Sequence, residues 1–543
     1  MTEVISVEIV RTPNQNQVDT VVGDLVRDSA PSRLTAGDAT LWGADAEPEA
    51  SIRLAWTTLH ETSRPLVAEI TALRDELLAE GVDRVVLAGM GGSSLAPEVI
   101  TGTARQKTGA SPLVVLDTTD PGQVAEALAG DLKRTVVVVS SKSGGTVETD
   151  SHRRIFEAAF AAEGVDAASR IVVVTDPGSP LEAASREAGY RKVFLADPHV
   201  GGRYSALTAF GLVPSGLAGA DVGKLLDEAA SAAPLVSADS PDNPAVVLAA
   251  TFAVAHAHGA EKIVFADTGS GIAGFGDWAE QLIAESTGKH GTGLLPVVVE
   301  GPGAPGFVDA RSDATTVAIG PATGSSTIAV EGTLGAQFLV WEYATALVSR
   351  VLEINPFDQP DVEAAKKASR SLLDSPAAAS AEPAFVDGPI EAYPSEGWLP
   401  ADVKTVAEAL KALVAAAPEH GYLSVQAYLD RVDDASFALV RPELAQRSHL
   451  QTTFGWGPRF LHSTGQYHKG GHQNGVFLQL TGKSETELDV PGRPYDLSTL
   501  QLAQALGDGQ VLAERGRPVL RLHLTDRVAG LAQLVEAIQE DGS

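Results

Sequence analysis

At 543 residues, the chain is longer than one hydrophobic core usually serves, so we expect two domains with attached segments. Its 40 basic and 70 acidic residues leave a formal charge of −30, which opposes non-specific attraction to nucleic acid or anionic lipid. Because the sequence contains no cysteine, disulfides, thiolate nucleophiles and iron–sulfur clusters are excluded. It shows neither a signal-peptide pattern nor an apolar run of about eighteen residues, so a cytoplasmic protein without membrane contact is expected.

The first half of the chain alternates short apolar runs with helical patterns. Residues 1–50 contain polar patches and are expected to form an irregular arm with room for one helix, and the apolar spacing of 64–80 predicts an amphipathic helix. Runs of β-branched residues then predict strands at 85–88, 113–116, 136–139, 171–174 and 193–195. Strands that are apolar on both faces, with helices between them, indicate a parallel sheet. We therefore predict a three-layer α/β/α domain over residues 51–240.

A second domain is expected to begin after the polar loop at 237–244. Its predicted helices are 245–258, 333–352 and 500–512, and its predicted strands are 262–266, 295–300, 315–319, 422–428, 476–480 and 519–524. The segment 371–400 is rich in proline and alanine, which predicts an inserted surface loop. These patterns favour a second α/β domain over residues 241–543, with a C-terminal α/β segment.

Two glycine- and hydroxyl-rich loops stand directly after predicted strands. The strand at 85–88 continues into Gly89-Met90-Gly91-Gly92-Ser93-Ser94, and the strand at 136–139 continues into Ser140-Ser141-Lys142-Ser143-Gly144-Gly145-Thr146. Glycine lets the backbone approach an anion closely, and the following helix offers unpaired N–H groups at its positive end. Ligands of parallel sheets bind at the carboxyl ends of the strands, where both loops fall. Together the loops predict a site for one phosphorylated small molecule.

Four further clusters carry residues suited to proton transfer. They are Gly201-Gly202-Arg203-Tyr204-Ser205, the segment 281–289 with Gln281 and Glu285 on one helical face, the segment 355–366, and the histidine-rich segment 460–472. A carboxylate can move a carbon-bound proton between neighbouring carbons, and arginine can stabilise the developing enediolate without losing its own proton. Histidine and lysine suit the opening of a cyclic sugar. The set is typical of a sugar-phosphate isomerase that needs neither metal nor cofactor.

Taken together, these clusters resemble the phosphoglucose isomerase family, whose members are built of two sugar-isomerase (SIS) domains. The resemblance runs from about residue 50 to the end of the chain. It is greatest to the isomerase half of bacterial transaldolase/isomerase fusions, although no transaldolase portion is found in this sequence. The fold that the resemblance implies is two SIS-type domains, each a mainly parallel sheet flanked by helices.

The resemblance implies a role for each matching residue at the phosphate end of the site. The family's glycine–serine loop is matched by Gly92 and Ser93. Its Ser-Lys-Ser/Thr-Gly-Thr-Thr loop is matched by Ser141, Lys142, Ser143 and Thr146. Gly145 stands where the family usually has a threonine, which removes one hydroxyl contact.

The resemblance also assigns the catalytic groups. Arg203 matches the arginine that stabilises the enediolate, and Glu285 matches the base that transfers the proton between C1 and C2, with Gln281 one turn before it. Gln359 and Lys366 match a segment whose lysine assists ring opening. His462 is similar to the ring-opening histidine.

One departure concerns the histidine. In the common bacterial isomerases the histidine motif lies before the lysine motif, whereas here His462 follows Lys366 by almost a hundred residues. His468 or His472 therefore stays open as the ring-opening group. A zinc site on the three histidines is disfavoured because Gly470-Gly471 interrupts the helix that would bring the last two together.

The expected function is the interconversion of glucose 6-phosphate and fructose 6-phosphate through an enediolate. One alternative is a dual phosphoglucose/phosphomannose isomerase, which would use the same phosphate cage. Another is a non-catalytic SIS module that senses a phosphosugar, and a nucleotide-dependent oxidoreductase is disfavoured because the dinucleotide-binding glycine pattern is missing. The resemblance further implies a homodimer, with a site between domains that a partner subunit could complete, and no nucleic-acid or membrane partner is expected.

Overall fold

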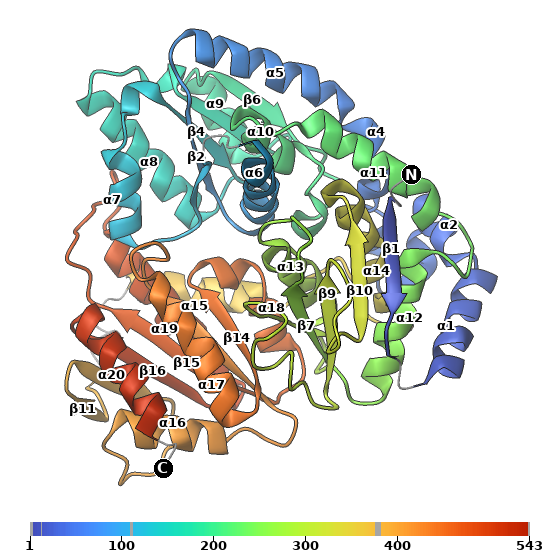
Figure 1. Cartoon of the computed structure of the whole chain (residues 1–543). Coiled ribbons are helices and arrows are strands. Elements are labelled where there is room, and N and C mark those ends of the chain that lie inside the picture. Colours follow the sequence, from blue (N-terminus) through green and yellow to red (C-terminus); the bar gives the residue numbers. More distant parts are fainter. Residues whose placement is uncertain (1–3, 12–13, 109–111, 375–381, 541–543) are drawn as a thin grey trace.

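The computed structural model describes residues 4–11, 14–108, 112–374 and 382–540. In these residues the strands form three separate sheets, each covered by helices (Figure 1). The prediction of mainly parallel α/β sheets flanked by helices is confirmed. Within the described part of the chain, no helix combines the length and apolarity needed to cross a lipid bilayer.

The first sheet holds the two loops predicted to bind phosphate. Its strand order is β3-β2-β4-β5-β6, and every pairing is parallel. The strands are β2 Arg84–Gly89, β3 Val114–Leu116, β4 Thr135–Ser140, β5 Ile171–Thr175 and β6 Lys192–Leu195. Because β4 is the valine-rich TVVVVS, buried along its whole length, it lies at the centre of the sheet. Gly89 at the end of β2 pairs with Ser140 at the end of β4, so the two loops begin side by side at the carboxyl edge of the sheet.

Helices cover this first sheet and connect its strands. They are α5 Arg64–Ala79, α6 Leu95–Thr108, α7 Pro121–Ala129, α8 Val147–Ala162, α9 Pro180–Glu187 and α10 Ala209–Leu217. The helix predicted at 64–80 is α5, which buries Ile70, Leu73 and Leu77 on one face. This agrees with the helical spacing of its apolar residues.

The second sheet has the order β1-β10-β9-β7-β8. Its strands are β1 Ile5–Ile9, β7 Lys262–Asp267, β8 Leu295–Val298, β9 Ala314–Ile319 and β10 Ile328–Gly332. The prediction of an irregular arm over 1–50 was wrong for β1, which pairs antiparallel with β10. The one helix allowed for in that arm agrees with α1 (Gln15–Arg27), which packs on α12 (Pro244–Ala257). Figure 1 shows β1 in dark blue beside the yellow strands. A short edge strand gives no local signal of the distant partner that stabilises it.

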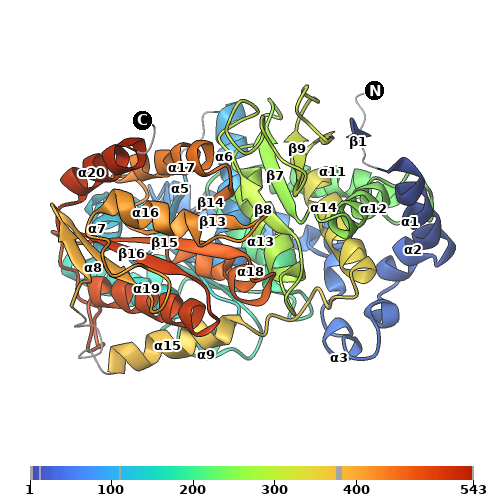
Figure 2. The ribbon, with the colours of Figure 1, turned by 90° about the horizontal axis from the view of Figure 1, so that it is seen from below.

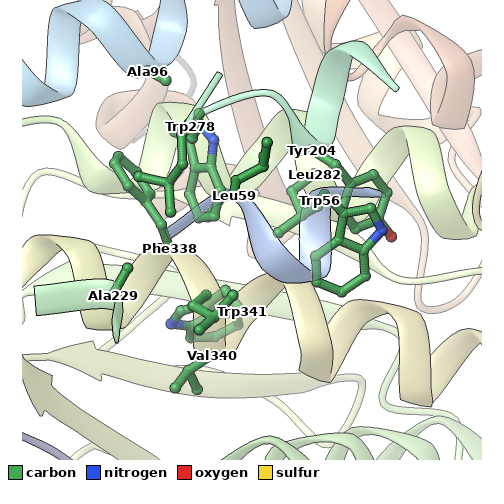
Figure 3. Packing of buried hydrophobic residues seen from close by; sticks show 14 of the residues in the cluster. Trp56, Leu59, Ala96, Tyr204, Ala229, Trp278, Leu282, Phe338, Val340 and Trp341 are labelled. Atoms are coloured by element: carbon green, nitrogen blue, oxygen red, sulfur yellow. The ribbon is translucent and has the colours of Figure 1, made fainter. Parts of the chain in front are cut away.

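Aromatic residues fill the core beneath the second sheet (Figure 3). Trp278 on α13 (Phe275–Thr287) packs against Phe338 on α14 (Leu334–Val351), with ring centroids 4.6 Å apart. Trp56 stacks on Tyr204 at 4.9 Å, and Figure 3 shows the two rings side by side. Because Tyr204 is the neighbour of Arg203, this stacking fixes the backbone that carries the arginine.

The third sheet lies between residues 385 and 524, in the order β11-β12-β16-β15-β13-β14. Its strands are β11 Phe385–Asp387, β12 Ile390–Pro394, β13 Tyr422–Tyr428, β14 Gln451–Trp456, β15 Gly475–Gly482 and β16 Val519–Leu524. Its helices are α16 Val406–Ala415, α17 Val440–Ser448, α18 Gly465–Gly470, α19 Leu497–Glu514 and α20 Arg527–Gln539. It buries a hydrophobic core of its own.

The third sheet bears on two of the domain predictions. The span 241–543, predicted as a second domain with an inserted loop and a C-terminal α/β segment, contains two separate sheets, because a hydrophobic pattern identifies a strand without saying which sheet it joins. The segment 371–400, predicted as a loop, contains the antiparallel pair β11–β12. Residues 375–381 of that segment lie outside the described residues. The boundaries at 50 and 240 stay a prediction.

Arg459 joins the third sheet to the other two. Its guanidinium forms an ion pair with Glu98 of α6 and donates hydrogen bonds to Asp117 after β3 (3.0 Å) and to Asp277 of α13 (3.2 Å). A guanidinium that is enclosed by three carboxylates holds all three elements in one geometry. His462 lies in the same helical turn, Arg459–His462. The contacts of Arg459 therefore fix the position of the backbone that carries His462.

Candidate active site

A cavity of about 920 Å³ lies where the three sheets meet, at the carboxyl ends of β2 and β4. The predicted site residues that line it are Gly92, Ser93, Ser141, Lys142, Ser143, Thr146, Arg203, Gln281, Glu285, Gln359 and His462. They come from all three sheets or their connections, and Figure 1 shows α13 and α18, which pack on each other, near the middle of the molecule. The structure therefore brings residues from 92 to 462 to one cavity within a single chain.

The two loops predicted to bind phosphate form a cage of hydroxyl and backbone N–H groups. Ser141 Oγ lies 3.0 Å from Thr146 Oγ1 and accepts a hydrogen bond from the Gly144 N–H at 3.1 Å. Thr146 is the residue before α8, whose N-terminus opens into the cavity, so the helix dipole favours an anion there. A Cβ at Gly92 would lie 2.0 Å from the carbonyl oxygen of Gly202, so only glycine permits the Arg203 loop to approach this closely.

Lys142 supplies a positive charge at the edge of the cage. Its ammonium forms an ion pair with Asp176, and both residues line the cavity. Burial raises the pKa of Asp176 although the Lys142 ammonium opposes the rise. A bound phosphate would share this ammonium with the carboxylate, as charge-assisted hydrogen bonds allow.

Lys142→Ala should raise the KM for a phosphorylated substrate about tenfold to a hundredfold, with kcat nearly unchanged, since one charge-assisted hydrogen bond contributes about 1.5–3 kcal/mol. Steady-state kinetics at constant ionic strength measure the change. Lys192→Ala is the matched control, because its ammonium pairs with Glu69 on the surface at 2.9 Å and does not line the cavity. An unchanged KM for Lys142→Ala contradicts the phosphate role.

Glu285 and Arg203 face each other in the buried part of the cavity. Glu285 is 5% exposed, and its Oε2 lies 3.4 Å from Arg203 Nε. Burial raises the pKa of Glu285, while the Arg203 guanidinium and the Gln281 amide oppose that rise. A carboxylate with a raised pKa is a better proton acceptor than an exposed glutamate, and so it suits general-base chemistry.

Arg203 also fixes the loop before α15 (Val362–Asp374). Its Nη2 donates to the carbonyl oxygens of Phe357 (3.1 Å) and Asp358 (3.0 Å) and to Gln359 Oε1 (3.4 Å). Within the described residues, its buried Nη1 has no hydrogen-bond partner. A buried donor without a partner is costly, so Nη1 is a polar group whose hydrogen-bonding capacity these contacts leave unused.

Lys289 holds the same loop from the other side. Its buried ammonium donates to the carbonyl oxygen of Asn355 and to Asp358 Oδ1 at 2.6 Å. Burial lowers the pKa of Lys289 to about 7. The loop that carries Gln359 is therefore held between two cations, Arg203 and Lys289.

His462 is held by an acidic residue that the sequence analysis missed. Its Nε2 lies 3.0 Å from Glu148 Oε1, and the Gln504 amide donates to the same oxygen at 2.7 Å. Burial raises the pKa of Glu148, but the charge and hydrogen bond of His462 lower it more, so the net shift is downward. An ionised Glu148 accepts Nε2–H, which leaves Nδ1 of His462 as the basic nitrogen. The available sequence signal was the position of Glu148, two residues after Thr146 in the first turn of α8.

The other two histidines lie elsewhere. His468 is buried against Tyr422, whose hydroxyl lies 3.1 Å from its Nδ1, and does not line the cavity. His472 pairs with Glu261 at 3.0 Å on the surface. Of the three candidates, His462 is the one that the structure places in the cavity.

Lys366 lies in α15, but its side chain is outside what the structure describes. The helix itself packs along α19, and its later residues Ser369, Arg370 and Leu373 line the cavity (Figure 2). A different lysine, Lys469, lines the cavity from α18. The sequence analysis had assigned no role to it.

Parallel α/β sheets that end in two glycine- and hydroxyl-rich loops, beside a buried carboxylate–arginine pair, form a site suited to an anionic ligand and to proton transfer. Comparison with known proteins finds similarity to phosphosugar isomerases. Residues 74–293 match the family model described as phosphoglucose isomerase. The matched segment contains both phosphate loops, Arg203, Gln281 and Glu285, whereas Gln359, Lys366 and His462 lie beyond it.

Similar proteins carry the name glucose-6-phosphate isomerase. The probable glucose-6-phosphate isomerase of Haloarcula marismortui is 28% identical over 377 residues, which are 60% of this chain and 84% of that protein. The glucose-6-phosphate isomerase of Synechococcus elongatus is 30% identical over 343 residues, which are 53% of this chain. The match spans 65% of the cyanobacterial relative, which is less than two thirds of its length.

Solved structures show the same fold. A hypothetical protein from Thermus thermophilus aligns with a TM-score of 0.58 at 25% identity, covering 68% of this chain and 99% of its own. A glucose-6-phosphate isomerase from Chlamydia trachomatis aligns with a TM-score of 0.56 at 18% identity, covering 69% of this chain and 90% of its own. At this identity the second likeness supports the fold alone.

Proposed function

We propose that the protein is a metal-independent aldose–ketose isomerase that interconverts glucose 6-phosphate and fructose 6-phosphate. The observation that carries the proposal is the buried Glu285 facing Arg203 in a cavity whose other end is a phosphate cage. The family match over residues 74–293 and the names of the similar proteins support the choice of substrate.

In the proposed mechanism the phosphate is held by Ser93 and by the loop from Ser141 to Thr146. His462, oriented by Glu148, opens the ring, and the resemblance assigns Lys366 to the same step. Glu285 then takes the proton from one of the two carbons C1 and C2 and returns it to the other.

Arg203 stabilises the charge that develops in this step. As Glu285 removes the carbon-bound proton, negative charge develops on the neighbouring oxygen. The guanidinium of Arg203, which faces Glu285, donates a hydrogen bond to that oxygen. Because the guanidinium is already fixed by the loop that carries Gln359, it needs no rearrangement in the transition state.

A coupled assay tests the proposal. Purified protein is given fructose 6-phosphate in excess EDTA, and glucose 6-phosphate is detected by its oxidation with an added dehydrogenase. Turnover that persists in EDTA is expected. Binding of fructose 6-phosphate without turnover contradicts the proposal and favours a phosphosugar-sensing module.

Mannose 6-phosphate supplied in the same assay separates a dual phosphoglucose/phosphomannose isomerase from a specific one. The two activities would share the phosphate cage and differ in the configuration tolerated at C2. The homodimer and the transaldolase-fusion relationship, both implied by the resemblance, stay predictions.

A further inference from the structure

A second buried cation borders the cavity on the side of the histidine segment. Lys469 of α18 is 2% exposed and lines the same cavity as His462. Its ammonium forms an ion pair with Asp508 of α19, which is 0% exposed, and donates to the carbonyl oxygen of Gly465 at 3.3 Å. A buried lysine is retained only with such compensation.

One face of α19 orients both this lysine and the histidine. Gln504 and Asp508 are one helical turn apart, so their side chains share a face. Gln504 donates to Glu148, which holds His462, and Asp508 holds Lys469. Two pairs of groups at the cavity therefore depend on α19. In each pair a carboxylate holds a group that can exchange a proton: Glu148 holds His462, and Asp508 holds Lys469.

The ammonium has a donor left for a ligand. It carries three N–H groups, and among the described residues the contacts found for it are those with Asp508 and Gly465.

Three other cations at the cavity are engaged elsewhere, and a fourth, Arg370 of α15, is exposed. Lys142 lies at the phosphate end with Asp176, and Arg203 faces Glu285. Arg53 pairs with Glu49 at 2.8 Å and is partly exposed. Lys469 is therefore the buried cation of the cavity that lies on the same segment as His462.

We propose that Lys469 is a catalytic residue that contacts the bound sugar and protonates its ring oxygen, the acid role that the resemblance alone gives to Lys366. This inference rests on the proposed isomerase function. As the bond between the anomeric carbon and the ring oxygen breaks, its electron pair stays on the ring oxygen, which takes a proton from the Lys469 ammonium. The proton of the anomeric hydroxyl passes to His462 Nδ1 as the carbonyl forms. Lys469 becomes neutral and His462 becomes charged, so protons and charge balance.

Two substrates separate ring opening from proton transfer at carbon. Fructose 6-phosphate is a cyclic furanose, whereas 5-deoxyfructose 6-phosphate lacks the hydroxyl that closes the ring and is open-chain. Isomerisation of the first is measured by the coupled assay. Exchange of the C1 hydrogen of the second in D₂O is followed by NMR, and this exchange needs Glu285 without needing ring opening.

Lys469→Met should lower kcat for fructose 6-phosphate about a hundredfold or more and leave C1 exchange of 5-deoxyfructose 6-phosphate within about threefold of the unmodified protein. The double variant Lys469→Met/Asp508→Asn, which leaves no unpaired buried carboxylate, should show the same selective loss. Lys366→Met is the comparison and should lose much less on the cyclic substrate.

Equal losses on both substrates in the double variant, or full activity on fructose 6-phosphate, overturn the role of Lys469. A selective loss in Lys366→Met that Lys469→Met does not show overturns it as well. Failure of the proposed function is distinct, because the unmodified protein would then turn over neither substrate.

Discussion

Glu285→Gln should reduce isomerisation of fructose 6-phosphate by about three to four orders of magnitude, because the amide cannot accept the carbon-bound proton. Glutamine has nearly the same shape as glutamate, so the cavity keeps its form. The affinity for a phosphorylated inhibitor such as 6-phosphogluconate should stay nearly unchanged, since the phosphate cage lies at the other end of the cavity. Coupled kinetics and titration calorimetry measure the two quantities.

A matched control is available on the same helix. Glu280 lies on α13 directly before Gln281, but it does not line the cavity. Glu280→Gln should therefore keep kcat close to that of the unmodified protein. The open-chain substrate adds a second control, because Glu285→Gln should abolish C1 exchange there as well. Retained turnover in Glu285→Gln would reject Glu285 as the base.

Arg203→Met should lower kcat by about two to three orders of magnitude and shift the acid limb of the kcat profile to higher pH. The first effect follows from the loss of a preorganised donor to the developing enediolate. The second has a defined sign. Burial already raises the pKa of Glu285, and Arg203 opposes that rise, so removing the guanidinium raises this pKa further. Because the base acts in its ionised form, activity should then appear only at higher pH.

Two further variants sharpen this test. Arg203→Lys keeps a positive charge but cannot reach Glu285 and the carbonyl oxygens of the 357–358 loop together. Compared with Arg203→Met, it should therefore restore the position of the acid limb more fully than it restores the value of kcat. Arg186→Met, a surface arginine on α9 paired with Glu182, serves as the neutral control. An acid limb that does not move in Arg203→Met contradicts the electrostatic coupling to Glu285.

Sequence reasoning placed the local parts of the candidate site well. The two phosphate loops were predicted because glycine, hydroxyl and strand signals lie within a few residues of one another. The pairing of Gly89 with Ser140 then puts both loops at one edge of the sheet. The one-turn spacing of Gln281 and Glu285 likewise follows from helical geometry, and both line the cavity.

Contacts between distant segments could not be predicted in this way. Glu148 meets His462 across more than three hundred residues, and Gln504 reaches Glu148 from α19. Lys469 gave no local signal that its ammonium would line a cavity. The pairing of Ile5–Ile9 with β10 was missed for the same reason, since a short strand does not encode its partner.

The sequence by itself determined the α/β class, the two glycine-rich loops after β2 and β4, and the helix that carries Glu285, because turn chemistry and hydrophobic periodicity act over a few residues. Only the tertiary structure decided that residues 241–543 form two sheets and that His462, rather than His468 or His472, enters the cavity. The physical reason is that packing of the third sheet, fixed by contacts such as those of Arg459 with Glu98, Asp117 and Asp277, depends on surfaces that meet only in the folded chain.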